Sequence, residues 1–146
     1  MSNRLELLLR RAGRELADYQ VARFYKIPEE MQSTPCDFIG FTSIGRAILI
    51  EAKMVNAPSL KIAGEPGLSA HQWCELGDAN KAGALSLICW ARGDICATIS
   101  FDMAAALAQD RKSIPWEKIE GRFLRPMRGG PCHLTLLDHW LPLRRS

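Results

Sequence analysis

Two carboxylates and a lysine are the residues of this chain that are best placed to do chemistry. Asp37 precedes one short apolar run, and Glu51 and Lys53 follow a second one, Ala47–Ile50. In a β-strand, Glu51 and Lys53 would point to the same face, because side chains alternate with a period of two. A buried pair of carboxylates repels itself and costs several kcal/mol unless a cation compensates it.

A divalent metal ion is the simplest compensating cation. The carboxylates of Asp37 and Glu51 and the backbone carbonyl of Ala52 form an all-oxygen set, which suits Mg²⁺ or Mn²⁺. Lys53 would then lie beside the metal, where its ammonium group could contact a phosphate or activate a water. The alternative is a surface hairpin with a Glu and a Lys near its end. The upstream Asp and the apolar run before Glu51 favour the metal site.

The two acids belong to a predicted β-hairpin. Residues 37–41 and 47–53 are rich in β-forming side chains, and a polar break that contains Gly45 separates them. The run Ala47–Ile50 is continuously apolar, which indicates a strand buried on both faces. The hairpin would bring the two acids together at the ends of its strands.

A helix and a strand precede the hairpin, and a loop follows it. Apolar residues recur at helical spacing over residues 2–19. Residues 21–27 form a strand that ends at Pro28. Residues 54–68 contain two prolines and two glycines, which is typical of a loop.

The second half of the chain alternates between helix and strand signals. A helix over residues 69–79 comes first, and the order of the main elements is α-β-β-β-α-β-β-α. This order predicts an α/β fold with a central mixed β-sheet flanked by helices. The later elements are strands at 84–91 and 95–101, a helix capped by Asp102 and ending at Ala108, a helix start at Ser113–Trp116, and an amphipathic helix at 134–141.

The order of Asp, a strand-length gap and Glu-x-Lys resembles the core of the restriction-endonuclease-like (PD-(D/E)XK) nucleases. The chain resembles the RecU family of Holliday junction resolvases more closely, and the resemblance covers most of the chain in order. The central matching segments are Asp37-Phe38-Ile39-Gly40, Gly45-Arg46, Glu51-Ala52-Lys53, His71-Gln72 and the strand Ala84–Trp90.

The resemblance implies a restriction-endonuclease-like core and a Mg²⁺-dependent endonuclease, with Mn²⁺ able to substitute. Asp37, Glu51 and the carbonyl of Ala52 would hold the metal, and Lys53 would orient the water or steady the phosphate. The implied substrate is the four-way DNA junction of recombination and repair.

Resolution of a junction needs two symmetric nicks, and one protomer has one such site, so we expect a homodimer. A two-fold interface presents the same patch from both chains. The candidate patches are the apolar faces of the helices predicted at 2–19 and 134–141. The alternative for each face is that it closes the domain core.

The chain departs from the RecU pattern in two places. RecU proteins carry an inserted stalk that engages the junction centre, but only ten residues separate Lys26 from Asp37 here. RecU proteins also have a Thr where this chain has Cys36, so any contribution of that hydroxyl is lost. A second interpretation is therefore a repair, restriction or phage nuclease that acts on duplex or flap DNA. A third is a catalytically silent DNA-binding relative, which the intact acids and lysine argue against.

Two further residues are candidates for the active site. Glu6 lies at the edge of the apolar stripe of the first helix, from where its carboxylate could point toward the metal; the alternative is a solvated helix acid. Gln72 lies beside the catalytic lysine in the related nucleases. The pattern Ser69-x-x-Gln72 is also a capping box, so the same residue has a structural explanation.

Clusters of arginine predict contacts with DNA phosphates. The net charge is only +3, but residues 121–146 hold five arginines against one acid. The alternative is a solvated basic surface. The predicted contact residues are Arg10, Arg11, Arg14, Lys61, Arg122, Arg125 and Arg128.

Composition bounds the class of protein. The 146 residues are 47% hydrophobic and 24% charged, which predicts one folded domain over 1–146 rather than a disordered chain. No apolar run approaches the roughly 20 residues that span a bilayer, and the N-terminus lacks the apolar region of a signal peptide. Five cysteines without a C-x-x-C spacing predict reduced thiols in a cytoplasmic protein.

Overall fold

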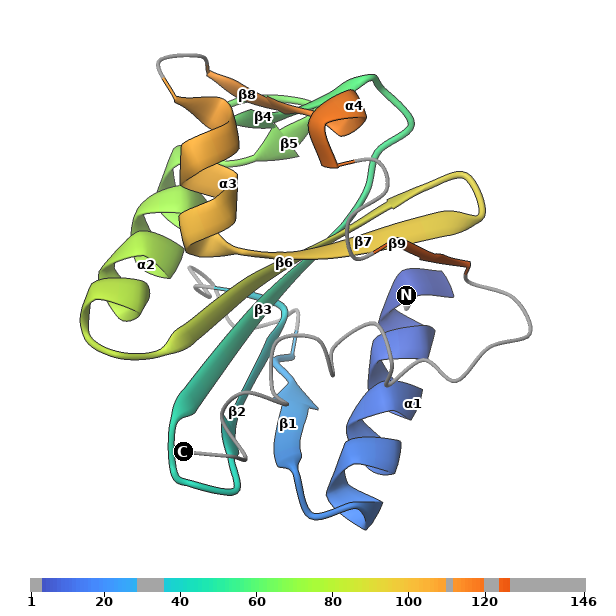
Figure 1. Ribbon diagram of the computed structural model, residues 1–146, viewed down its shortest axis with the longest axis vertical. Coiled ribbons are helices and arrows are strands. Elements are labelled where there is room, and N and C mark those ends of the chain that lie inside the picture. Colours follow the sequence, from blue (N-terminus) through green and yellow to red (C-terminus); the bar gives the residue numbers. More distant parts are fainter. Residues whose placement is uncertain (1–3, 29–35, 110–111, 120–123, 127–146) are drawn as a thin grey trace.

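The computed structural model describes residues 4–28, 36–109, 112–119 and 124–126, with only the backbone of the last three. A six-stranded mixed sheet forms its centre, in the order β1-β2-β3-β6-β7-β9 (Figure 1). A three-stranded sheet, β5-β4-β8, lies beyond one end of it. The elements are α1 Arg4–Asp18, β1 Ala22–Lys26, β2 Phe38–Thr42, β3 Ala47–Met54, β4 Ser59–Ile62, β5 Gly67–Leu68, α2 Ala70–Lys81, β6 Leu85–Arg92, β7 Ile95–Ser100, α3 Phe101–Ala108, β8 Ser113–Pro115, α4 Trp116–Ile119 and β9 Leu124–Pro126.

The central sheet changes strand direction at β3. Strands β1, β2 and β3 form an antiparallel meander, and β6 then pairs with β3 in parallel. A parallel pair needs a crossover, and here the crossover carries β4, β5 and α2. The predicted α/β class, the hairpin and the central mixed sheet flanked by helices are confirmed.

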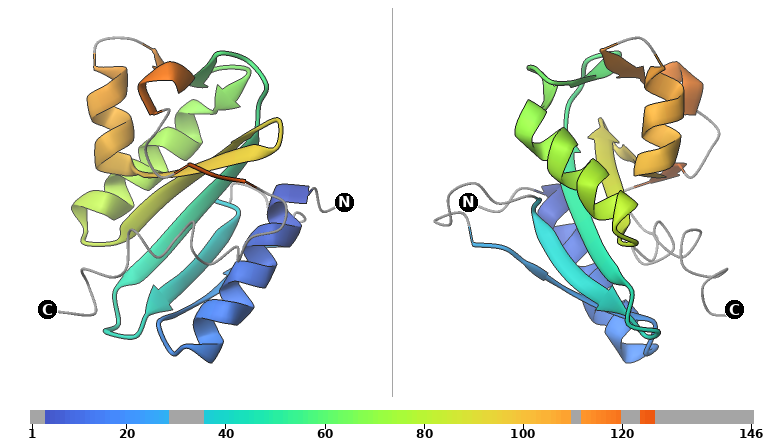
Figure 2. Two further views of the ribbon diagram at one scale, coloured as in Figure 1. Left: turned by 45° about the vertical axis from the view of Figure 1, so that its right-hand side comes forward. Right: turned by 90° about the vertical axis from the view of Figure 1, so that its left-hand side faces the viewer.

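Each face of the central sheet carries its own apolar core. On β3, Ile48 and Ile50 pack in the cluster that includes the leucines of α1, whereas Leu49 packs in the cluster that includes residues of α2 and α3. This division follows from the alternation of side chains along a strand. Figure 2 shows α1 beside the meander and α2 on the other side of β3. The expected burial of this strand on both faces is confirmed.

The apolar face of α1 is fully used within the chain. Its leucines and alanine are between 0% and 4% exposed except Leu5 within that same range at 2%, and they pack on β1, β2 and β3. This face therefore closes the core, and its assignment as a candidate dimer surface is wrong. The other candidate surface, residues 134–141, lies outside the described residues. Within the described ranges, no helix is both long enough and apolar enough to cross a membrane.

The segment predicted as a loop over residues 54–68 contains two short strands. Strand β4 pairs with β5 in parallel and with the distant β8 in antiparallel fashion. Leu60 and Leu68 are both fully buried. The prolines and glycines correctly marked turns here, but the pairing partner lies some fifty residues away in sequence (Leu60 faces Ile114), and local composition does not reveal it.

Two predicted helix starts need correction. Ser100 caps α3 by accepting a hydrogen bond from the backbone N–H of Met103, whereas Asp102 lies in the first turn and accepts one from Asn80. The helix expected from Ser113 begins only at Trp116, because the preceding residues form β8.

We predict that Gly40→Ala destabilises the fold through the β1–β2 pair. A Cβ atom at Gly40 would collide with the carbonyl oxygen of Arg23 and would lie 2.5 Å from the Cα of Phe24, so the backbone of β1 must shift. We expect a loss of about 2 kcal/mol or more in chemical denaturation. Gly64→Ala is the matched control, because its nearest neighbour would be the flexible side chain of Lys61 at 3.7 Å. Equal stability of the two variants would contradict this account.

Candidate active site

The register of the hairpin brings the two predicted acids together. Phe38 of β2 pairs with Ile50 of β3, and continuing this ladder by one residue places Asp37 opposite Glu51. The Oδ2 atom of Asp37 accepts a hydrogen bond of 2.8 Å from the backbone N–H of Ala52. Asp37 is thus fixed across the end of β3, next to both Glu51 and Ala52.

Glu51 is the buried centre of the site. Its side chain is 2% exposed, and its Oε1 lies 3.4 Å from Nζ of Lys53. The same oxygen accepts a hydrogen bond of 3.1 Å from Nε2 of Gln72. Its Oε2 is buried and accepts no hydrogen bond from any residue that the structure describes. Burial first, and the neighbouring carboxylate of Asp37 second, raise the pKa of Glu51 to about 8.

These two acids fit a hard divalent cation. A buried carboxylate oxygen without a donor, beside a second carboxylate, is the environment that a cation relieves. The donors are oxygens, which Mg²⁺ and Mn²⁺ prefer. Among the described residues, no group of three or more His, Cys, Asp or Glu side chains could hold a metal. Two side-chain ligands and the predicted backbone carbonyl of Ala52 therefore make up the candidate set.

Gln72 performs both functions that the sequence left open. Its Oε1 accepts a hydrogen bond of 3.0 Å from the N–H of Ser69, and Oγ of Ser69 accepts one from the N–H of Gln72. This is a complete capping box at the start of α2. The amide nitrogen of the same side chain donates to Glu51. The cap therefore holds the amide in the orientation that Glu51 needs.

Lys26 belongs to the site, although sequence analysis did not assign it a role there. Its side chain is 10% exposed, and its Nζ lies 3.5 Å from Oδ1 of Asp37 and 3.7 Å from Oε1 of Glu6. Glu6 is buried, as the interpretation of an inward-pointing helix acid requires, and it reaches Asp37 through this lysine. Lys26 shares a face of β1 with Ala22 and Phe24, both buried. A lysine on the inward face of a strand was the signal that could have identified it.

Cys36 contributes neither a hydroxyl nor a charge to the site. Its thiol is buried and donates a hydrogen bond to the carbonyl oxygen of Phe38 at 2.9 Å. Burial raises the pKa of Cys36 to about 12, so the thiol stays protonated. Its position beside Asp37 is therefore structural.

The predicted DNA contacts lie on several elements. Arg10, Arg11 and Arg14 are exposed on α1, and Arg11 pairs with Glu15 at 3.2 Å. Lys61 is exposed on β4. The backbone of Arg125 lies in β9, while Arg122 and Arg128 fall outside the described residues.

The stability of the fold should fall with rising pH because of Glu51. Its pKa is about 8 in the folded chain against 4.5 ordinarily, so the folded state holds a proton that the unfolded state releases. Stability is then lost between these two values as the pH rises. We predict that Glu51→Gln gains in melting temperature relative to the unmodified chain between pH 5 and pH 8.5, in buffer with EDTA. Asp18→Asn, an exposed acid at the end of α1, is the control. A constant difference for Glu51→Gln across this range would contradict the raised pKa.

Comparisons with known proteins give one structural likeness. No protein-family model matches the chain, and no curated protein sequence matches it. The structure is similar to that of Hjc from Archaeoglobus fulgidus, a Holliday junction resolvase from an archaeal hyperthermophile. The two are 18% identical, the match covers 75% of this chain and 88% of that chain, and the TM-score is 0.49. The function of the chain is therefore argued from its own site.

Proposed function

We propose that this chain is a metal-dependent endonuclease that cleaves phosphodiester bonds in branched DNA, with the four-way junction as its main substrate. One observation carries the proposal. Asp37 and Glu51 face each other at the end of β3, and the lysine and the glutamine expected in such a nuclease both contact the buried Glu51. The RecU-like order of motifs in the sequence supplies the junction as substrate.

Each residue has a role that follows from its place. Asp37, Glu51 and the carbonyl of Ala52 would hold Mg²⁺, with Mn²⁺ able to substitute. When bound, the ion would lower the pKa of a water and stabilise charge on the phosphate undergoing attack. Lys53 is 22% exposed, so its ammonium group can meet a phosphate that arrives from solvent. Gln72 orients Glu51.

Lys26 and Glu6 act as positioning residues rather than as catalytic ones. Lys26 neutralises part of the charge of Asp37 and holds its Oδ1, which leaves Oδ2 on the backbone of Ala52. Glu6 holds Lys26 from the side of α1. A charge-paired chain of this kind fixes the side chain of Asp37 before any substrate binds.

A junction resolvase must make two nicks, so the proposal includes a homodimer. Each protomer supplies one Asp37–Glu51 pair, and a two-fold axis would match the symmetry of the junction. The apolar face of α1 is not available for the interface, because it lies in the core. We further propose that this dimer acts in the cytoplasm.

The decisive experiment is cleavage of DNA with and without metal. We expect nicking of a plasmid and of a four-way junction in Mg²⁺ or Mn²⁺, and none in EDTA. Asp37→Asn and Glu51→Gln should each slow cleavage by roughly a hundredfold or more, because metal-ion catalysis supplies several kcal/mol of transition-state stabilisation. DNA binding by these variants should change little. Asp18→Asn serves as a matched control outside the site.

The outcomes separate the three interpretations of the sequence. Preference for the four-way junction over duplex of equal length supports the resolvase. Equal cleavage of both would keep the nuclease and exclude the resolvase. DNA binding without cleavage in any metal would exclude the nuclease and favour a silent relative.

The two functions of Gln72 can be separated by substitution. Ser69→Ala removes the cap but leaves the amide donor, so it should cost about 1 kcal/mol of stability with most cleavage retained. Gln72→Glu keeps an oxygen for the cap but replaces the donor to Glu51 with a carboxylate. This variant should unfold near the normal midpoint and cleave slowly. Parallel losses of stability and cleavage in both variants would show that Gln72 is only a cap.

A further inference from the structure

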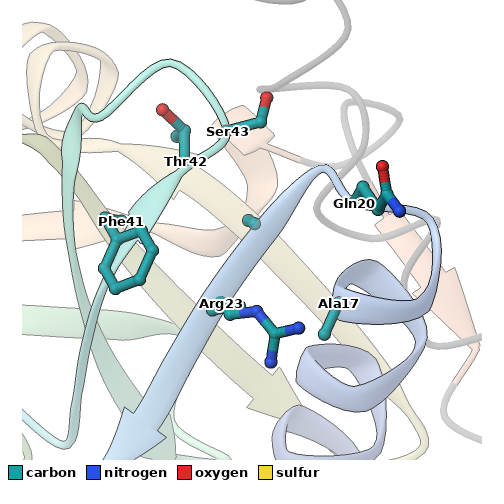
Figure 3. Close-up of a pocket in the computed structure, with 7 residues that line it drawn as sticks. Ala17, Gln20, Arg23, Phe41, Thr42 and Ser43 are labelled. Carbon is teal, nitrogen blue, oxygen red and sulfur yellow. The ribbon is translucent and has the colours of Figure 1, made fainter.

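Two hollows lie side by side between α1 and the edge strand β1. The larger, of about 260 Å³, is lined by Arg10, Arg14 and Lys26 among others. The smaller, of about 150 Å³, is lined by Phe41 and by residues that follow α1 and β2. Ala17 and Arg23 line both, so the hollows are continuous. Figure 3 shows Arg23 extending from β1 toward Ala17, with Phe41 on the neighbouring strand.

The lining of these hollows is positively charged. Arg10, Arg14, Arg23 and Lys26 contribute four cations, and no acid lines either hollow. In the part of the chain that the structure describes, Arg10, Arg14 and Arg23 form no ion pair. Their charges are therefore available for an anionic ligand. Regularly spaced anions, such as the phosphates of a nucleic acid strand, match a row of this kind.

Two exposed aromatic side chains flank the same hollows. Tyr25 lines the larger and is 59% exposed, and Phe41 lines the smaller and is 49% exposed. Large aromatic surfaces left in water on neighbouring strands are costly unless a ligand covers them. Bases inside a double helix are already stacked on each other, so such rings can stack only on unpaired bases.

The groove leads directly to the candidate active site. Lys26, at the end of the larger hollow, lies 3.5 Å from Asp37. On the sheet, Tyr25 pairs with Ile39, which pairs with Leu49, two residues before Glu51 on the same face. A strand lying over β1 and β2 would therefore continue to the acids.

We infer that this groove along β1 binds a single unpaired strand of DNA, with phosphates on the cations and bases on Tyr25 and Phe41. The inference rests on the proposed nuclease function and narrows its substrate. The enzyme would act on branched DNA that contains a single-stranded segment, such as a flap or an open junction, in preference to DNA that is paired throughout.

The test measures binding in EDTA, where no cleavage occurs. The probes are a single-stranded oligothymidylate and a blunt hairpin duplex with the same number of nucleotides. Tyr25→Ala and Phe41→Ala should each weaken binding to the single strand by about fivefold or more, with duplex binding changed less than about twofold. Tyr25→Phe should retain affinity, because its ring can still stack. Ile95→Ala, an exposed apolar residue on β7, is the matched control.

The charge of the groove has a separate readout. Arg23→Gln should reduce the slope of log K against log salt for the single strand by about 0.7, whereas the aromatic variants should leave this slope unchanged. An unchanged slope for Arg23→Gln, together with unchanged affinity for the aromatic variants, would overturn the groove. So would a shift from dimer to monomer in these variants at unchanged affinity for the single strand, because the face would then be an interface between two copies.

Cleavage of branched DNA in Mg²⁺ by the unmodified chain keeps the two proposals distinguishable. If it cleaves and the aromatic variants bind the single strand normally, the groove is wrong and the nuclease stands. If it cleaves no DNA while these variants lose affinity for the single strand, the groove stands and the nuclease is wrong.

Discussion

The structure depends on keeping two carboxylates close together at the end of a buried strand. Asp37 and Glu51 are opposed by the register of β2 and β3, and burial and mutual repulsion both act against their ionised forms. The surroundings offset this cost with two lysines, one amide donor and one backbone N–H. The offset is incomplete, because the pKa of Glu51 remains raised and one of its oxygens receives no donor among the described residues. A folded chain that retains such a cost is prepared for a cation.

The supports of the site are at the same time elements of ordinary secondary structure. The amide of Gln72 is oriented by the cap of α2, and the side chain of Asp37 is tied to the backbone of β3. Lys26 is placed by the alternation of β1, since it follows Phe24 on the inward face. Damage to the site and damage to the fold are therefore coupled, and a loss of activity identifies a catalytic group only when stability is measured beside it.

Local patterns in the sequence predicted most of what local forces determine. Period-two alternation placed Glu51 and Lys53 on one face, and the capping box placed Gln72 at the start of α2. The strands β4, β5 and β8 escaped prediction because their pairing is made between distant residues, such as Leu60 and Ile114. Lys26 was overlooked because its importance comes from two acids on other elements. The apolar face of α1 could have suited a dimer or a core, and only the tertiary packing decides between them.

The mixed direction of the central sheet has a consequence for how this fold can vary. Strand β3 leaves the sheet into β4, β5 and α2, and β6 returns the chain to the position beside β3. The turn between β4 and β5 exposes Ala63, Glu65 and Pro66 to solvent. Extra residues inserted in this turn would lengthen an excursion whose two ends are fixed by strand pairing. The fold can thus change what stands over one side of the acids while the spacing between the acids stays the same.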